Sequence, residues 1–193
     1  MNDLLGLLAF AFVSTVTPGP NNVLLWASGV QFGFRATLPH VFGTALGIGA
    51  LATCAAAGVA ALLAAVPGSE VALKVAGTAY LAWLTWQVAA GGGIDDERVA
   101  KPLGLGQAIG FQFLNPKAWL FALAAISTYR IGGLPVAVGS AVAVVAMMAV
   151  TVPSAALWAA GGTALRTFVA GRQRAIDIAL AALLAASIAL IWV

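Results

Sequence analysis

A proline–glycine–proline break inside a long apolar stretch is the feature that most constrains this chain. The residues Thr17-Pro18-Gly19-Pro20-Asn21-Asn22 interrupt a run from Leu4 to Val30 that otherwise reads as a membrane-spanning helix. Two prolines remove two backbone donors and end a helix. In hydrocarbon, backbone groups freed in this way are costly unless protein or water satisfies them. We therefore expect the break to face the protein interior or a wet cavity.

This break has two interpretations. It could be a proline kink that only helps helices to pack, or a discontinuous helix that lines a substrate site, as in many secondary transporters. A second break, Asn115-Pro116-Lys117, interrupts another apolar run from Leu105 to Thr128. Because the chain breaks an apolar segment twice, we favour the discontinuous-helix interpretation.

The composition places the chain in a membrane. Of its 193 residues 62% are hydrophobic and 8% are charged, whereas soluble domains carry roughly 25% charged residues. Apolar stretches of about 20 residues recur along nearly the whole length, which predicts a polytopic helical protein. Almost nothing is left to form a soluble domain, so residues 1–193 are predicted to form one transmembrane domain with the lipid bilayer as a partner.

Few residues could support catalysis or metal binding. The chain has one histidine, one cysteine (Cys54) and no carboxylate inside an apolar segment away from its ends. Metal sites need several carboxylate, imidazole or thiolate ligands close together. The net charge of +3 is scattered and forms no basic run. We therefore expect no enzyme activity, no cofactor, no metal site and no nucleic-acid partner.

The fold class predicted is all-α, with about six transmembrane helices. Turn residues and charges separate six apolar segments, which run over Leu4–Val30, Pro39–Val66, Val71–Ala90, Leu105–Thr128, Leu134–Gly161 and Ala175–Val193. Small residues such as Gly43 and Gly47 let membrane helices approach closely, so the second segment is expected in the bundle interior. Gly/Ala faces also leave a homodimer open.

The two halves of the chain resemble each other at a constant offset of 96 positions. Pro20 then corresponds to Pro116 and Pro39 to Pro135. Three spans in each half would make the second half enter the membrane from the opposite side. The prediction is a 3+3 inverted repeat, with half-repeats of about 1–96 and 97–193, an architecture common among secondary transporters.

The loop charges predict an orientation. Lys and Arg are enriched in cytoplasmic loops. One side of the predicted bundle carries six such residues, and the other side carries Lys74 and Arg130. This count places the odd-numbered loops in the cytoplasm and both termini in the periplasm.

The candidate substrate site consists of the two breaks. Asn115 suits a helix N-cap and Pro116 the first helical position, and the offset gives Gly19 and Pro20 the same two roles. Helix N-termini bind anionic groups such as carboxylates. Lys117 adds a full positive charge there, unless it only extends towards the membrane interface.

Neighbouring polar residues complete this candidate site. Pro18 belongs to the first break, and the amides of Asn21, Asn22 and Asn115 offer donors and acceptors for a polar substrate. Tyr80 is either an interfacial packing residue or a hydroxyl in the cavity. His40 is expected at the cytoplasmic mouth of the second segment, where it could titrate near neutral pH. An interfacial histidine without such a role is favoured.

These motifs resemble the LysE/RhtB family of bacterial amino-acid exporters. The resemblance covers the whole length and rests on Thr17-Pro18-Gly19-Pro20-Asn21-Asn22, Gly33-Phe34-Arg35, Lys74-x-x-Gly77-x-x-Tyr80-Leu81 and Phe113-Leu114-Asn115-Pro116-Lys117-Ala118. Within the family the chain is most similar to the short cysteine and O-acetylserine exporters. The resemblance implies an inner-membrane protein that exports a small neutral amino acid at the expense of the proton motive force.

The sequence departs from the family at one place that bears on mechanism. Many members carry an acidic residue or a histidine where this chain has Gly47-Ile48-Gly49-Ala50. Proton antiport and facilitated efflux therefore both stay open. Two other functions also stay open: export of cationic amino acids, and a membrane scaffold that transports nothing.

Overall fold

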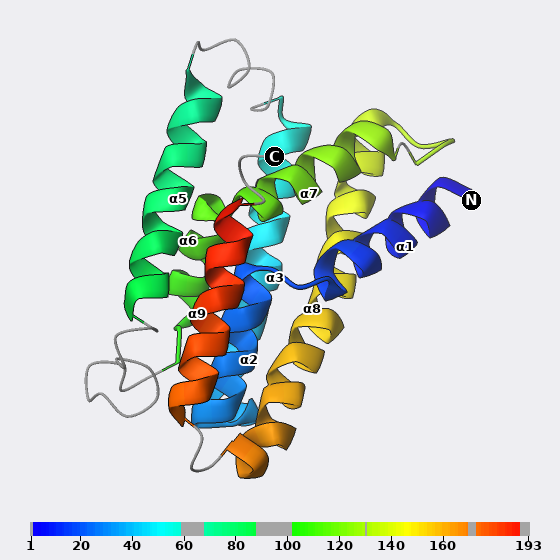
Figure 1. Cartoon of the computed structure of the whole chain (residues 1–193). Helices are drawn as coiled ribbons and strands as arrows, with labels where there is room; N and C mark the ends of the chain where they lie inside the picture. The colour runs from blue at the N-terminus through cyan, green and yellow to red at the C-terminus, as the bar shows by residue number, and fades with distance from the viewer. Residues whose placement is uncertain (1, 59–67, 88–101, 130, 170–172, 190–193) are drawn as a thin grey trace.

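The protein is helical in the computed structural model, which describes residues 2–58, 68–87, 102–129, 131–169 and 173–189 (Figure 1). The helices are α1 (Asn2–Val16), α2 (Pro20–Phe32), α3 (Phe34–Ala56), α5 (Ser69–Gln87), α6 (Leu105–Leu114), α7 (Pro116–Thr128), α8 (Val136–Val169) and α9 (Gln173–Ala189). Over these residues the all-α prediction is confirmed.

Both predicted breaks separate two helices. The axis bends by 60° between α1 and α2 and by 77° between α6 and α7. Gly19 precedes α2 in an extended conformation, and Pro20 occupies the first turn. Asn115 and Pro116 have the same two roles at the start of α7. A proline fits the first turn because the N–H that it lacks would have no partner inside the helix.

Each broken pair packs against a long helix from the other half of the sequence. Helices α1 and α2 contact α8, whereas α6 and α7 contact α3, and α5 pairs with α9. In Figure 1, α1 and α7 extend to the same side, away from the more upright helices. The two breaks are therefore held between α3 and α8, where all four pieces of broken helix meet.

Glycines make the closest helix contacts. A Cβ added at Gly43 would lie 2.6 Å from the Leu105 carbonyl oxygen on α6, and one at Gly29 would lie 2.1 Å from the Ala159 carbonyl oxygen on α8. These backbones can approach only because both positions lack a side chain. The expectation that the second apolar segment packs inside the bundle is confirmed for α3.

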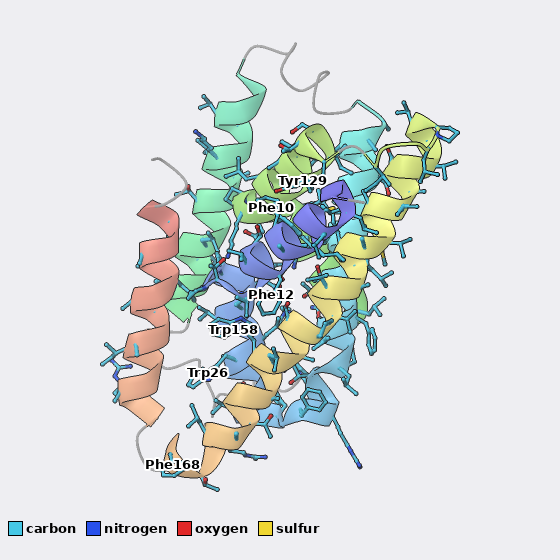
Figure 2. The ribbon with its side chains drawn as sticks, turned by 90° about the vertical axis from the view of Figure 1, so that its right-hand side faces the viewer. Phe10, Phe12, Trp26, Tyr129, Trp158 and Phe168 are labelled. Carbon is cyan, nitrogen blue, oxygen red and sulfur yellow. The ribbon has the colours of Figure 1, made fainter. Side chains whose placement is uncertain are left out.

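Aromatic side chains fill the space between α1 and α7. The ring of Phe10 lies 5.8 Å from that of Phe121 and 5.5 Å from that of Tyr129, measured between centroids. Figure 2 shows Phe10 of α1 close to Tyr129, the residue that follows α7. This apolar cluster joins the two projecting helices, one from each half of the sequence.

Among the described residues, fewer helices than the six predicted spans are long and apolar enough to cross a membrane. Two described helices, α3 and α8, are long and apolar enough to cross a membrane, and each bent pair could supply one more, which makes at most four. The six-span 3+3 inverted repeat is not confirmed and stays a prediction, as do the homodimer and the position of the termini. The separator around residues 91–98 lies outside the described residues.

One predicted helix boundary is wrong. Pro39 was expected at a helix start, but it lies inside α3, which begins at Phe34. The chain turns at Gly33, whose φ of 81° suits a residue without a side chain. Pro135 does directly precede α8, which begins at Val136.

Candidate functional site

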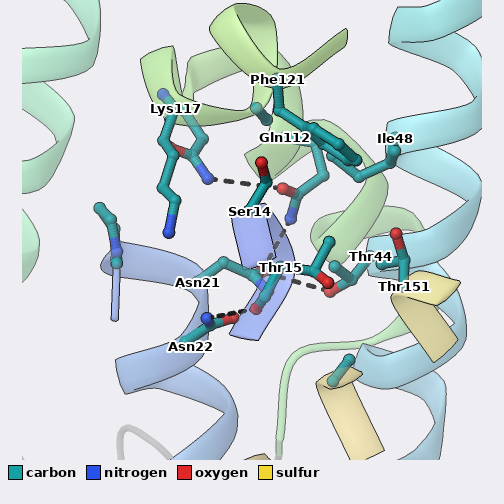
Figure 3. A pocket seen from close by; sticks show the side chains of 15 residues that line it. Ser14, Thr15, Asn21, Asn22, Thr44, Ile48, Gln112, Lys117, Phe121 and Thr151 are labelled. Carbon is teal, nitrogen blue, oxygen red and sulfur yellow. Dashed lines mark hydrogen bonds between the residues drawn. The ribbon is translucent and has the colours of Figure 1, made fainter. Parts of the chain in front are cut away.

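A cavity lies between the two breaks. Its volume is about 40 Å³, which is enough to hold water. Figure 3 shows polar side chains from α1, α2, α3 and α7 around it. The lining residues are Ser14, Thr15, Gly19, Pro20, Asn21, Asn22, Thr44, Ile48, Gln112, Asn115, Lys117, Ala118, Phe121, Thr151 and Ala155.

Most of the predicted site residues meet at this cavity. Six of them line it, and Pro18 lies at its edge through its carbonyl, which contacts Lys117. Pro116 begins α7 without lining the cavity. Tyr80 lies in α5, but its side chain is outside the described residues, so its predicted role stays a prediction.

The Lys117 ammonium crosses from the second break to the first. Its Nζ donates hydrogen bonds to the Thr17 carbonyl at 2.7 Å, the Thr17 hydroxyl at 3.0 Å and the Pro18 carbonyl at 3.1 Å. These carbonyls follow the end of α1, where a helix has no internal donors for them. The lysine therefore donates to carbonyl groups that have no donor within the helix. Its positive charge is also favourable near the C-terminus of a helix, which carries a partial negative charge.

Two further side chains satisfy the end of α1. The Asn22 amide donates 2.8 Å hydrogen bonds to the carbonyls of Thr15 and Thr17. The Trp158 indole on α8 donates to the Val16 carbonyl at 3.3 Å. Every carbonyl from Thr15 to Pro18 thus accepts a side-chain donor, which meets the requirement for such a break inside a membrane.

Gly19 leaves room for the lysine. A Cβ at this position would lie 2.9 Å from the Lys117 Cδ and 3.1 Å from its Nζ. The backbone of Gly19 is extended, with φ of −175°, so other residues could adopt its conformation. The close approach of Lys117 is therefore the reason for a glycine here.

The second break is capped by its own residue. The Asn115 side-chain oxygen accepts from the Lys117 backbone N–H at 3.2 Å, as an N-cap does. On the other side of this break, the Trp119 indole donates to the Phe113 carbonyl at 2.9 Å. The predicted capping role of Asn115 is confirmed.

A buried amide network lies beneath the cavity. Asn21 Oδ1 accepts from Gln112 Nε2 at 2.8 Å and from the Thr44 hydroxyl at 3.2 Å, and His40 Nε2 lies 3.4 Å away. Gln112 Oε1 in turn faces the Asn115 amide at 3.5 Å. The network connects α2, α3, α6 and the second break in the interior.

Sequence reasoning missed several members of this site. Gln112 is 1% exposed, and its only sequence signal is a polar residue three positions before Asn115 in an apolar run. Hydroxyl groups at the opposite wall were also missed, among them Thr15, whose Oγ1 donates to the Ser154 Oγ at 2.9 Å. Nothing in the sequence near Thr15 indicates that α8 supplies this partner.

The expectation for His40 is wrong. It is not at an interfacial mouth but 1% exposed, inside the bundle next to Asn21. The reason is that α3 begins at Phe34 instead of Pro39, so His40 lies almost two turns into the helix. Thr44, one turn further on, hydrogen-bonds to the His40 carbonyl and also points to Asn21.

The charge of the cavity is positive. Lys117 is the ionisable side chain among the residues that line it, and none of them is acidic. Within the described part of the chain, no three histidine, cysteine or acidic side chains come close enough to hold a metal ion. The site is suited to a small molecule that carries a negative group and also needs hydrogen-bond donors and acceptors.

Comparison with known protein families fits this geometry. Residues 12–190 match the family described as LysE type translocator, which is nearly the whole chain. The chain belongs to this family. Its members are transporters, so the resemblance seen in the sequence motifs is confirmed at the level of the family.

Individual relatives match over part of their length. Proteins named cysteine/O-acetylserine efflux protein from Salmonella typhimurium and Escherichia coli are each 33% identical to this LysE-family chain over 121 residues. The match covers 62% of this chain and 62% of each relative. No solved structure matches significantly.

Proposed function

We propose that this LysE-family protein exports a small neutral amino acid, or a close derivative, from the cytoplasm across the inner membrane. The observation that carries the proposal is the cavity in which two helix N-termini, the Lys117 ammonium and the amides of Asn21 and Asn22 converge. An amino acid needs just such a combination, because its carboxylate and ammonium must both exchange water for protein groups.

The carboxylate is assigned to the Lys117 side of the cavity. In the present conformation the ammonium donates to carbonyl and hydroxyl oxygens of Thr17 and Pro18. A carboxylate is a stronger acceptor than a neutral carbonyl or hydroxyl, because its full negative charge adds Coulomb attraction to the ammonium. A substrate that enters would thus take over part of the ammonium, and the nearby N-terminus of α2 adds positive charge.

The substrate ammonium is assigned to the amide side. Asn21 lines the cavity, and its Oδ1 is the acceptor on which the buried donors converge. The remaining wall combines apolar side chains, among them Ile48 and Phe121, with uncharged hydroxyl groups such as that of Thr15, and the cavity is small. These features favour a short side chain without charge.

The residues that line the cavity also disfavour the alternative function, export of cationic amino acids. A lysine or arginine substrate would bring a second positive group, and no acidic side chain lines the cavity to receive it. Lys117 would in addition repel it. The names of the relatives, cysteine/O-acetylserine efflux proteins, support the neutral class.

The proposed transport cycle is a rocking motion around the paired breaks. Each broken pair contacts the long helix of the other half, so a relative movement of the halves would open the cavity to one side at a time. This is the alternating access expected of an inverted repeat. Both termini would face the periplasm, which reporter fusions active on only one side of the membrane can test.

The decisive experiment is efflux from proteoliposomes. Purified protein is reconstituted, and the vesicles are loaded in turn with radiolabelled cysteine, O-acetylserine, threonine and lysine. We expect efflux of the small neutral compounds and none of lysine above protein-free vesicles. Preferred efflux of lysine would support the cationic alternative, and no efflux of any compound would support the scaffold.

A further inference from the structure

Three threonines from three different helices line the cavity. They are Thr15 on α1, Thr44 on α3 and Thr151 on α8, and together we call them the threonine wall. Figure 3 shows Thr44 and Thr151 on the side of the cavity away from Lys117. The proposed function assigns the substrate carboxylate to the Lys117 side, and it gives no substrate group to the hydroxyls of the threonine wall.

The three hydroxyl groups make the same local hydrogen bond. Each Oγ1 donates to the carbonyl four residues earlier in its own helix, over 2.7 Å in Thr15, 2.9 Å in Thr44 and 2.7 Å in Thr151. A carbonyl can only accept, and a hydroxyl has a single hydrogen. Further contacts, such as that of Thr15 with Ser154 and that of Thr44 with Asn21, draw on the same hydrogen. The threonine wall therefore has lone pairs, and no hydrogen, left for a molecule in the cavity.

Thr151 shows this most clearly. Its side chain is 2% exposed, the Met147 carbonyl engages its hydrogen, and no donor among the described residues reaches its oxygen. Ile48, Phe121 and Ala155, which also line the cavity, are apolar. The lone pairs of Thr151 can therefore form a hydrogen bond only with a molecule that brings a hydrogen of its own.

A fourth hydroxyl in the lining does not share this restriction. Ser14 lines the cavity, and its hydroxyl makes no hydrogen bond to another described group. Such a hydroxyl can turn to donate or to accept. Any preference for a donating substrate must therefore come from the threonine wall.

We propose that the threonine wall, and Thr151 above all, selects amino acids whose side chain donates a hydrogen bond. The side-chain O–H or S–H of the substrate donates to Thr151 Oγ1, while its ammonium and carboxylate lie as in the proposed function. The threonine wall then favours a hydroxyl or thiol amino acid over an aliphatic one of the same size. This inference rests on the proposed function and narrows its class of small neutral substrates.

The inference ranks four compounds by their side chains. Serine has a hydroxyl donor, cysteine has the weaker thiol donor, and alanine has none. O-acetylserine carries an ester, which only accepts hydrogen bonds, so its oxygens would face the lone pairs of the threonine wall. One net hydrogen bond corresponds to a rate difference of about threefold to tenfold below saturation. We expect serine to exceed alanine by this factor, with cysteine between them and O-acetylserine below serine.

The test compares serine with alanine in Thr151→Val. Valine has the shape of threonine without the hydroxyl, and the Met147 carbonyl keeps its backbone hydrogen bond within α8. Proteoliposomes are loaded with labelled serine or labelled alanine below saturation, and the two efflux rates are divided. We expect this ratio to fall to near unity in Thr151→Val and to persist in Thr151→Ser, which keeps the hydroxyl. Because both rates come from one preparation, the ratio does not depend on how much protein is folded.

Thr53 offers a matched control. Its hydroxyl donates to the Gly49 carbonyl at 2.8 Å, in the same pattern on α3, but Thr53 does not line the cavity. Thr53→Val removes the same kind of hydrogen bond away from the site, so the ratio of serine to alanine efflux should stay at the wild-type value. An equal fall in Thr53→Val and Thr151→Val would show a general effect of losing such a bond and would overturn the inference.

The remaining outcomes distinguish this inference from the proposed function. Equal efflux of serine and alanine by the wild type, or an unchanged ratio in Thr151→Val, would refute the selection by the threonine wall and leave amino-acid export intact. If the wild type exports none of the four compounds, the proposed function fails and the inference fails with it.

Discussion

The two breaks share a design but differ in where their partners come from. At both, a proline begins the second helix and a tryptophan indole satisfies a carbonyl at the end of the first. The second break obtains its cap from Asn115 and its indole from Trp119, both within six residues. The first break has a local donor in Asn22, but its Val16 and Pro18 carbonyls depend on Trp158 and Lys117, which lie 142 and 99 positions away.

We infer from this difference that the second break is rigid, whereas the contacts that stabilise the first break can be lost. Local caps form wherever the helix forms, because the interacting groups are fixed by neighbouring backbone. Contacts between distant segments can be lost when those segments move apart. For the proposed export function, the first break is therefore the place where a substrate carboxylate would replace a protein contact, while the second break stays intact and positions Lys117.

The largest expected effect comes from removing the Lys117 charge. Lys117→Met keeps the stem but removes the donor to Thr17 and Pro18 and the proposed carboxylate partner. We expect export to fall about tenfold to a hundredfold, as the loss of about 1.5–3 kcal/mol implies. Initial efflux rates from proteoliposomes, at matched protein levels, measure this. Lys117→Arg should lose less, because it keeps the charge in a different geometry. Wild-type export by Lys117→Met would mean that the substrate site lies elsewhere.

Two tryptophan substitutions compare how much an indole hydrogen bond stabilises each break. Trp119→Phe and Trp158→Phe each leave one carbonyl without its indole donor, at a cost of about 1–2 kcal/mol. The larger loss is expected for Trp119, whose hydrogen bond is 2.9 Å long against 3.3 Å for Trp158. Unfolding of the detergent-solubilised variants by denaturant would show the order, and the reverse order would contradict the local–distant distinction.

The cap of the second break should matter for stability more than for transport. Asn115→Ala removes the acceptor for the Lys117 backbone N–H and should cost about 1 kcal/mol. Asn115→Ser keeps a capping oxygen and serves as the control. The same unfolding measurement compares the two; equal stability would show that the cap contributes nothing.

The smallest expected effect is at Gly19. Gly19→Ala would push the Lys117 side chain away from its rotamer, at about 0.5–1.5 kcal/mol, and reduce export about threefold with little change in stability. Gly106→Ala is a matched control, since nothing lies within 4 Å of a Cβ at that position. Efflux rates for the pair, compared with the wild type, would show whether the lysine needs this space. An equal rate for both variants would mean that it does not.

The sequence predicts the local parts of this site and misses the distant ones. The roles of Asn115, Pro116 and Pro20 follow from capping and proline rules that act over a few residues. Gln112 and His40 become site residues only because α3 and α6 bring them to Asn21, and no short-range pattern contains that information.

The same limit applies to the fold. An all-helical bundle with two broken segments is evident from the alternation of apolar runs and prolines. The sequence does not show which helices contact each other, because membrane helices all present similar apolar surfaces. Their pairing depends on close backbone contacts at small residues, such as that of Gly29 against Ala159. The start of α3 was misplaced because Gly33 outweighs Pro39 as a boundary.

The donors from Lys117 and Trp158 have a consequence for biosynthesis. Ribosomes deliver the chain from its N-terminus, so α1 and α2 reach the membrane before either donor has been made. Until then, the Val16 and Pro18 carbonyls have no protein partner and must stay hydrated. We therefore expect the first broken pair to complete its insertion only when the second half of the chain arrives.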